Sequence, residues 1–154
     1  MKNTGRTNYR VVERLLALRN PEGAYEYAKD VVKGRWPEAE PFIAKEPKIA
    51  YHYARDIIRG RWPEAEPYIA KDQFWSYTYA KDIIEGRFPE AENLIAQNGY
   101  LAVRYAKEVI GDRWPEAEPL IATKDIFLKP YKRFLKEIGR ETDAWSLEDW
   151  KIEK

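Results

Sequence analysis

The chain repeats one seven-residue motif, which first occurs as Gly34-Arg35-Trp36-Pro37-Glu38-Ala39-Glu40. Two more copies span residues 60–66 and 86–92, and the last spans 111–118 with its glycine, Gly111, one place earlier relative to the arginine. The aromatic residues of the motif fall at positions 36, 62, 88 and 114, so consecutive copies lie 26 residues apart. A period in this range is typical of stacked-repeat proteins, in which each repeat buries its apolar face against its neighbours.

The residues before each motif predict a helix. In the second repeat, two rows of apolar residues spaced by four form one stripe and predict a helix over residues 48–59. Pro47 suits the first helical position, where its missing N–H is harmless. Gly60 is expected to end this helix in the left-handed conformation of a C-cap.

A second, shorter helix is predicted after each motif. It begins either at Pro63 or near Pro67, because a proline beyond the first turn removes a backbone hydrogen bond. The third repeat carries Asn93 at the place of Pro67, so this proline is not required. Asp72 is expected to cap the first helix of the next repeat.

Two aromatic rows recur at the 26-residue period, and both are predicted to form the structural core between repeats. The first row is Tyr27, Tyr53, Tyr79 and Tyr105, and the second is Trp36, Trp62, Phe88 and Trp114. Rows of alanine accompany them and would let helices approach closely. Because short helices need a packed face, each helix pair is expected to fold only between its neighbours.

The sequence therefore predicts an all-α fold, a short α-solenoid of helix–turn–helix repeats with helical caps, in a single domain. Residues 1–20 are expected to form an N-terminal capping half-repeat, 21–124 the four repeats and 125–154 a C-terminal helical cap. In the second cap, a helix is expected to contain Phe134, Leu135 and Ile138 and to break near Gly139. A last amphipathic piece, with Ser146 as its N-cap, is expected at Trp145, Leu147, Trp150 and Ile152.

Composition excludes several classes of protein. The net charge is +1, so no global attraction to nucleic acid or to an anionic membrane is expected. There are no cysteines, which excludes disulfides and thiolate metal sites. No apolar run is long enough to span a membrane, and residues 1–10 do not resemble a signal peptide. A soluble, cytoplasmic protein is the expectation.

No catalytic motif stands out. The single histidine, His52, occupies a position that other repeats fill with different residues, so it is interpreted as a surface residue. The glutamate pair Glu38 and Glu40 recurs four times, and residues two apart on a helix point away from each other. No calcium-loop, zinc or phosphate-loop pattern occurs. We therefore expect no enzyme activity, no cofactor and no metal.

The repeated arginines leave two interpretations open. A row formed by Arg35, Arg61, Arg87 and Arg113 could bind phosphates while the adjacent aromatic residues stack on bases. Alternatively, each arginine pairs with the glutamate three residues on, Glu38, Glu64, Glu90 or Glu116, or with the same glutamate in the next helix pair, and the tryptophans are buried spacers. We favour the second interpretation because the glutamates neutralise the arginines.

Positions that vary between repeats are candidates for binding a partner, since invariant positions build the stack. One such position holds Lys48, Phe74, Tyr100 and Ile126, and the next holds Ile49, Trp75, Leu101 and Phe127. Aromatic residues often anchor interfaces. The predicted partner-binding residues are Phe74, Trp75, Tyr77, Tyr100, Lys48 and Arg59. Packing in the core between repeats is an equal alternative for Phe74 and Tyr100, and it is slightly favoured for Trp75.

The unit Tyr-Ala-Lys/Arg-Asp-Val/Ile-Val/Ile-x-Gly-Arg-Trp-Pro-Glu-Ala-Glu, at residues 27–40 and 53–66, resembles short tandem repeats of proteins encoded by large tailed bacteriophages. The resemblance covers residues 20–124 and implies a phage-encoded protein that acts in the bacterial cytoplasm. It carries over no functional residues. The function expected is a non-enzymatic protein-binding module directed at a host protein, such as a defence factor; the alternatives are nucleic-acid binding and a structural, virion-associated role.

Overall fold

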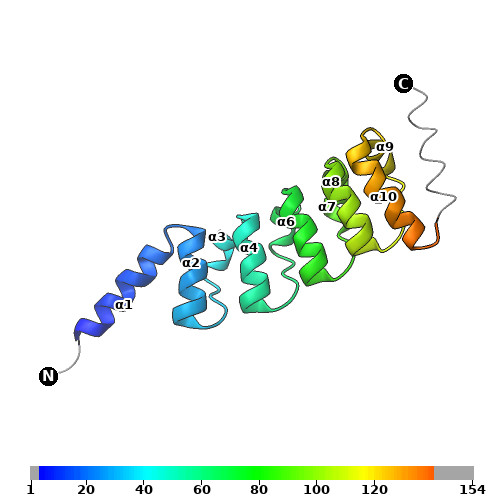
Figure 1. Cartoon of the computed structure of the whole chain (residues 1–154). Helices are drawn as coiled ribbons and strands as arrows, with labels where there is room; N and C mark the ends of the chain where they lie inside the picture. The colour runs from blue at the N-terminus through cyan, green and yellow to red at the C-terminus, as the bar shows by residue number, and fades with distance from the viewer. Residues whose placement is uncertain (1–3, 141–154) are drawn as a thin grey trace. The chain divides into compact units, whose positions relative to one another are not determined.

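The computed structural model describes residues 4–140, with side chains from residue 10 onward. Every regular element in this range is a helix, and the helices follow one another as joined pairs (Figure 1). By their internal contacts, the residues divide into two compact units, 1–69 and 70–154. The two units are treated separately below.

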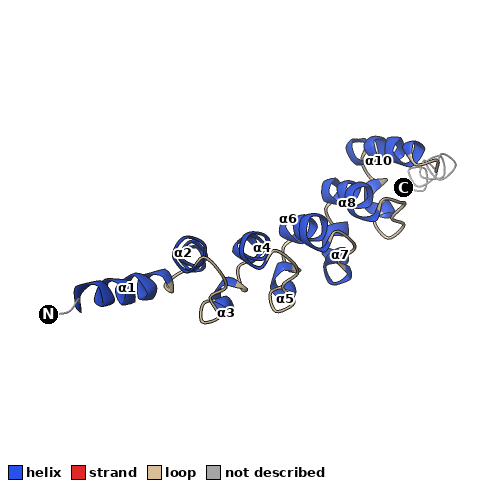
Figure 2. Ribbon diagram, turned by 90° about the horizontal axis from the view of Figure 1, so that it is seen from below, coloured by secondary structure: helices blue, strands red, loops and turns tan. Residues whose placement is uncertain are grey.

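The N-terminal unit begins with α1 (Thr4–Ala17) and then contains two repeats. In the first, α2 (Pro21–Tyr27) continues into a π-helical turn, η1 (Ala28–Val32), and is followed by the short helix α3 (Glu40–Ile43). In the second, α4 (Pro47–Tyr53) continues into η2 (Ala54–Ile58) and is followed by α5 (Glu66–Ile69). Figure 2 shows α2 and α4 in one layer and the short helices α3 and α5 in another.

The C-terminal unit repeats this arrangement. It consists of α6 (Gln73–Tyr79) with η3 (Ala80–Ile84), α7 (Pro89–Ala96), α8 (Gly99–Tyr105) with η4 (Ala106–Ile110), α9 (Glu118–Ile121) and α10 (Asp125–Glu137). The helices α6, α8 and α10 pack side by side in sequence order. The predicted fold class, an all-α chain of helix–turn–helix repeats of the α-solenoid type, is confirmed by this pattern.

The first helix of each repeat ends in a wide turn. In the second repeat, the N–H groups of Arg59 and Gly60 both donate to the carbonyl oxygen of Ala54, at 2.7 and 3.2 Å. The residue in the left-handed conformation is Arg59, with φ of 60°, so the prediction that Gly60 takes this role is wrong. The other repeats place Lys33, Glu85 and Gly111 at the same position, each with positive φ. The earlier glycine of the last motif is therefore the residue that suits this conformation.

The start of the second helix depends on one proline. Where Pro41, Pro67 or Pro119 is present, the helix begins one residue before it, and the preceding residues form a turn. A proline here has no N–H to donate to the carbonyl four residues earlier, so the helix cannot extend further back. With Asn93 at this place, α7 begins at Pro89. The two alternative starting points are thus both used, in different repeats.

Seven of the eight residues in the two predicted aromatic rows are buried. Tyr53, Tyr79 and Tyr105 are 0% exposed, and the members of the second row are at most 3% exposed. Within repeats, the ring of a tyrosine packs on the aromatic residue nine positions on, as in Tyr105 on Trp114 with centroids 4.9 Å apart. Tyr27 is half-buried, and its ring packs on Trp36 in the same way. The prediction of a core spacer is confirmed for all four members of the Trp36 row.

Within the described residues, α10 is the last helix of the C-terminal unit. Tyr131 of α10 keeps the register of the tyrosine row and is fully buried. On the side where a further repeat would pack, α10 carries Lys129 and Lys132 at the register of Val103 and Ala106. Cations there would oppose the packing of a further repeat; the C-terminal cap over residues 125–154 stays a prediction. The helix ends before Gly139, as predicted; the predicted piece at Trp145, Leu147, Trp150 and Ile152 lies outside the described residues.

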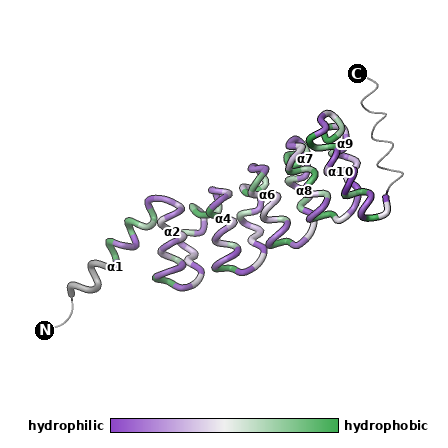
Figure 3. The backbone as a smooth tube through the Cα atoms, in the orientation of Figure 1, coloured by the Kyte–Doolittle hydropathy of each residue, from purple (hydrophilic) through white to green (hydrophobic). Residues whose placement is uncertain are grey.

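The face of α1 that is exposed to solvent is apolar, whereas a capping repeat normally has a polar outer face. Val11, Val12, Leu15 and Leu16 are each at least 50% exposed, whereas Ala17 is buried. Figure 3 shows hydrophobic residues along this helix. α1 packs on α2, and Arg14 pairs with Glu38 of the first repeat. The helix occupies the place predicted for a capping half-repeat, but it presents apolar side chains to solvent.

Candidate protein-interaction edge

The residues that join one repeat to the next form a polar network, which we call the repeat joint. In the joint of the third repeat, the Tyr105 hydroxyl accepts a hydrogen bond from the backbone N–H of Phe88 at 2.7 Å. It donates to Glu92 Oε1 at 2.9 Å. Arg87 donates to the two oxygens of Glu92 from Nε and Nη2, at 2.7 and 2.6 Å. The tyrosine of one helix pair thus ties together the motif of the preceding pair.

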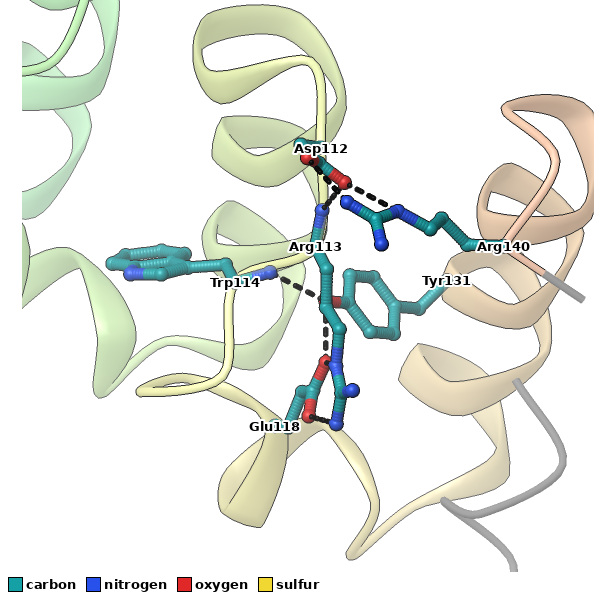
Figure 4. A network of polar contacts seen from close by, with 6 residues as sticks. All are labelled: Asp112, Arg113, Trp114, Glu118, Tyr131 and Arg140. Atoms are coloured by element: carbon teal, nitrogen blue, oxygen red, sulfur yellow. Dashed lines mark hydrogen bonds and ion pairs between the residues drawn. The ribbon is translucent and has the colours of Figure 1, made fainter. Parts of the chain in front are cut away.

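The same joint occurs elsewhere in both units. In the fourth repeat it consists of Arg113, Trp114, Glu118 and Tyr131 (Figure 4). Asp112 adds an ion pair with Arg140 there. In the N-terminal unit, the joint consists of Arg35, Trp36, Glu40 and Tyr53. The polar groups of these motif residues thus bond to one another and to the tyrosine of the next helix pair, so they connect neighbouring repeats.

The electrostatics of the joint favour its charged glutamate. Hydrogen bonds from Arg35, and next from Tyr53, hold the pKa of Glu40 below its usual value despite partial burial. Burial opposes the charge of Glu92, but bonds from Arg87 and Tyr105 outweigh it and lower the pKa of Glu92. Burial raises the pKa of Tyr53 to about 12. Glu40 and Glu92 are therefore ionised, and the hydroxyl of Tyr53 is protonated, at neutral pH.

This geometry corrects one prediction about the arginines. Each arginine pairs with the glutamate five residues on, not three: Arg35 with Glu40, Arg61 with Glu66, Arg87 with Glu92 and Arg113 with Glu118. The turn before the second helix brings the later glutamate back to the arginine. Glu38 instead bonds to Arg14. The two glutamates of a pair thus face different partners and do not converge on one site.

A second network spans neighbouring repeats. The Tyr77 hydroxyl donates to Glu108 Oε2 at 2.6 Å, and Lys81 and Arg104 pair with the same carboxylate. Tyr25 and Asp56 form the corresponding bond in the N-terminal unit. Tyr77 is only 3% exposed, so the prediction that it contacts a partner is wrong. The sequence signal was present, since tyrosine recurs at 25, 51 and 77 and an acid at 56, 82 and 108.

His52 is more enclosed than a plain surface residue. It is partly buried, and its ring centroid lies 6.2 Å from that of Tyr25 and 5.1 Å from that of Tyr51. Burial, followed by the charge of Arg55, lowers the pKa of His52. The imidazole is therefore neutral at pH 7 and packs among aromatic rings.

Three large apolar side chains remain exposed at one register of the C-terminal unit. Phe74, Tyr100 and Ile126 are 50, 61 and 74% exposed. Each is the second residue of its helix, in α6, α8 and α10 respectively. We call these three residues the apolar edge. The same register holds the exposed residues Glu22 and Lys48 in the N-terminal unit, so the backbone position does not itself require an apolar side chain.

An open groove of about 580 Å³ lies beside the apolar edge, between the starts of α6 and α8. Phe74, Tyr100, Leu94 and Leu101 supply its apolar lining. Hydrogen bonds within the protein hold three of its polar side chains. Asp72 Oδ1 accepts from the N–H of Trp75 at 2.9 Å, and Asn98 Oδ1 accepts from the N–H of Leu101 at 3.2 Å. Gln73 Nε2 donates to the carbonyl oxygen of Leu94 at 3.0 Å. The groove is thus preformed, and polar and apolar atoms line it in about equal parts.

Of the remaining predicted site residues, Trp75 lies next to the apolar edge, and Lys48 and Arg59 lie in the N-terminal unit. Trp75 is half-buried, and its ring meets that of Phe74 edge-on at 5.0 Å. Lys48 is exposed but belongs to the N-terminal unit, and Arg59 is exposed in the helix-ending turn. Ile126 was placed at the correct register by the sequence, but the preference for aromatic residues left it out of the predicted site.

Within residues 4–140, no group of three His, Asp or Glu side chains is placed to hold a metal ion. In the same range, no helix has both the length and the apolar character needed to cross a lipid bilayer.

Comparisons of the chain with models of known protein families, with curated proteins and with solved structures find no match. The resemblance of the repeat unit to phage-encoded repeats stays a prediction.

Proposed function

We propose that this chain is a non-enzymatic protein-binding module whose partner docks on the apolar edge. The observation that carries the proposal is the exposure of Phe74, Tyr100 and Ile126 at one register, beside a preformed groove. Large apolar residues gathered at an exposed surface are typical of interaction sites. Aromatic residues beside a pocket are also the usual anchors of protein interfaces.

The proposal is supported by the fact that the positions that hold the repeats together differ from the positions of the apolar edge. The motif residues form the repeat joints, and the residue at the register of Phe74 takes no part in them. This register can therefore hold different residues, as it does with Glu22 and Lys48 in the N-terminal unit. A stack of repeats can therefore change this register to fit a partner without losing its own contacts. Repeat proteins bind extended partners through such surfaces.

The nature of the partner is also part of the proposal. The resemblance to phage-encoded repeats favours a protein of a bacterial host, met in the host cytoplasm. Nucleic-acid binding along the arginine row has less support, because base stacking needs exposed rings and Trp36, Phe88 and Trp114 are buried. The guanidinium groups of that row also already face glutamates.

The test is affinity capture from bacterial lysate, with quantitative mass spectrometry of the retained proteins. The wild-type chain is compared with a variant carrying Phe74→Lys, Tyr100→Lys and Ile126→Lys. Lysine is chosen because Lys48 shows that this register accepts it. We expect the variant to lose the proteins that the wild type enriches.

A second variant, with Val31→Lys, Val32→Lys and Phe42→Lys, is the control. It also replaces three exposed apolar residues and adds the same charge, but in the N-terminal unit. The control should retain the enriched proteins. Loss with the control and retention by the edge variant would contradict the proposal, as would retention by both.

A further inference from the structure

We infer that copies of this chain associate end to end, with the outer side of α10 in one copy packed on the outer side of α2 in the next. The outer side of α2 is the side that faces away from α4, and the outer side of α10 is the side that faces away from α8. The apolar edge takes no part in this contact, which goes beyond the proposed function.

A contact of fixed spacing joins neighbouring repeats inside each unit. The Tyr25 hydroxyl donates to Asp56, 31 residues further along the chain, at 2.5 Å. Lys29 pairs with the same carboxylate at 3.8 Å. The C-terminal unit repeats this contact around Glu108, with a tyrosine at 2.6 Å and a lysine at 2.9 Å. The carboxylate therefore lies on the side of its helix that faces the preceding repeat, and the tyrosine and lysine lie on the side that faces the next one.

The first repeat carries the acidic half of this contact on the outer side of α2. Asp30 stands at the register of Asp56, and Glu26 lies one turn before it. Both side chains are exposed although α1 packs on α2. Among the described residues, neither makes a hydrogen bond or an ion pair. An acid at the register of Glu26 is particular to this repeat, because the later repeats hold His52, Thr78 and Arg104 there.

The last described helix carries a basic half at the corresponding registers. Lys129 and Arg133 of α10 stand where the contact has its tyrosine and its lysine, and both are exposed. Lys132 and Lys136 belong to the same side of the helix by its periodicity. Asp125 pairs with Lys129 at 3.7 Å and offsets one of these four cations. The outer side of α10 therefore keeps a net positive charge.

A second copy of the chain fits both outer sides at once. When the spacing of 31 residues is continued across the junction, Lys129 of one copy meets Asp30 of the next, with Arg133 at the place of the lysine. Repeats inside the chain suit these cations less well, because they present an apolar side chain where α2 has Gly23. The residues at that register are Ile49, Trp75, Leu101 and Phe127.

The chain's own C-terminal residues are a poorer occupant. Residues 141–154 contain five acids and two lysines, so their charge complements the outer side of α10 but repels the outer side of α2. Only a partner with both an acidic and a basic side meets the two outer sides, and a second copy has this property. The contact joins two different surfaces, so each added copy leaves one acidic and one basic side open for another.

The experiment is sedimentation velocity of the full chain over a range of protein concentrations. Between about 0.01 and 1 M salt, the Debye length falls from about 30 to 3 Å. We expect the average mass to rise with protein concentration at low salt and to return to that of the monomer at high salt. Lys129→Glu with Arg133→Glu, and separately Glu26→Lys with Asp30→Lys, should each weaken association by about tenfold or more.

Mixing the two variants is the decisive step. Each variant keeps one wild-type outer side, so the mixture contains matched pairs and should associate at low salt, although neither variant does so alone. The control is Lys45→Glu with Lys48→Glu, which makes the same charge change at exposed residues of the second repeat and should associate as the wild type does.

Three results would overturn the inference. The first is a wild-type chain that stays monomeric at low salt up to about 1 mM. The second is association that survives reversal of either outer side, since the contact would then lie elsewhere. The third is a mixture that stays monomeric although circular dichroism shows the helix content of the wild type in both variants.

Discussion

The repeat joints and the apolar edge use the same kinds of side chain in opposite ways. In the joint, Tyr105 and Phe88 are fully buried, and the tyrosine hydroxyl has both a donor and an acceptor. At the edge, Tyr100 lies only five residues before Tyr105 and is 61% exposed. The joint repeats with little change, whereas the edge register holds a different residue in every repeat. The comparison teaches that repetition marks the scaffold and variation marks the surface available to a partner.

The largest expected effect is at the joint. Trp114→Ala should lower the free energy of unfolding by about 3–5 kcal/mol, because it empties a fully buried site between repeats. Trp114→Phe is the matched control, since Phe88 fills the same register of the third repeat. Denaturant unfolding measures both. An unchanged midpoint for the alanine variant would mean that the ring is not a core spacer.

The tyrosine hydroxyl should matter next. Tyr105→Phe leaves the buried N–H of Phe88 without its acceptor and should cost about 1–3 kcal/mol in unfolding free energy. Among the described residues, no hydrogen bond is found for the hydroxyl of Tyr27, so Tyr27→Phe should change stability by less than about 0.5 kcal/mol. Equal effects of the two substitutions would show that the joint hydroxyls contribute nothing specific.

A third prediction concerns pH and the second network. Burial opposes the charge of Glu108, but Arg104, Tyr77 and Lys81 outweigh it and lower the pKa of Glu108 to about 2, from a usual value of 4.5. Since the folded pKa is depressed, the stabilisation is present above pH 4.5 and is lost as the pH falls toward 2. Glu108→Gln should cost about 1 kcal/mol at neutral pH. It should also flatten the acid side of the stability curve; an unaltered curve would argue against this network.

The helix-ending turn predicts smaller effects of opposite sign. Gly111→Ala should destabilise the chain by about 1 kcal/mol, because φ at this position is 70°. Arg59→Gly should stabilise it by about 0.5 kcal/mol, since φ there is 60° and glycine adopts it without strain. Thermal unfolding of the two variants measures the difference. If both variants are destabilised, the side chain of Arg59 must have a role beyond the turn.

The smallest expected effect is at the edge. Tyr100→Lys should change the free energy of unfolding by less than about 0.5 kcal/mol, because the side chain is exposed and its register accepts lysine in the second repeat. The same substitution is expected to weaken partner binding. If Tyr100→Lys lowers the free energy of unfolding as much as Tyr105→Phe does, then Tyr100 contributes to the stability of the fold, and the separation of edge from joint residues is wrong.

The sequence predicted the parts of this fold that depend on repetition. A residue type that recurs every 26 positions must meet the same surroundings each time, and this identified the Tyr53 and Trp62 rows as core. Features that depend on local backbone geometry were harder to predict from the sequence. Glu38 and Glu40 are both within reach of Arg35 in sequence, and only the turn before α3 decides between them.

The same limit applies to the candidate site. Phe74 and Tyr100 stood out because their register varies between repeats. Tyr77 is aromatic like these two residues, but its side chain is buried, and its hydroxyl bonds to Glu108, which lies 31 residues further along the chain. The recurrence of tyrosine at 25, 51 and 77 and of an acid at 56, 82 and 108 was a signal for this contact, but only the offset between neighbouring helices shows which of these residues meet.

Backbone amide exchange at two joint residues tests the central claim most directly. The N–H groups of Phe88 and Trp114 donate to the hydroxyls of Tyr105 and Tyr131. We predict that both amides exchange slowly with deuterium, and that Tyr105→Phe speeds exchange at Phe88 while leaving Trp114 protected. Rapid exchange of both amides in the wild-type chain would contradict the claim that each tyrosine ties its helix pair to the preceding repeat.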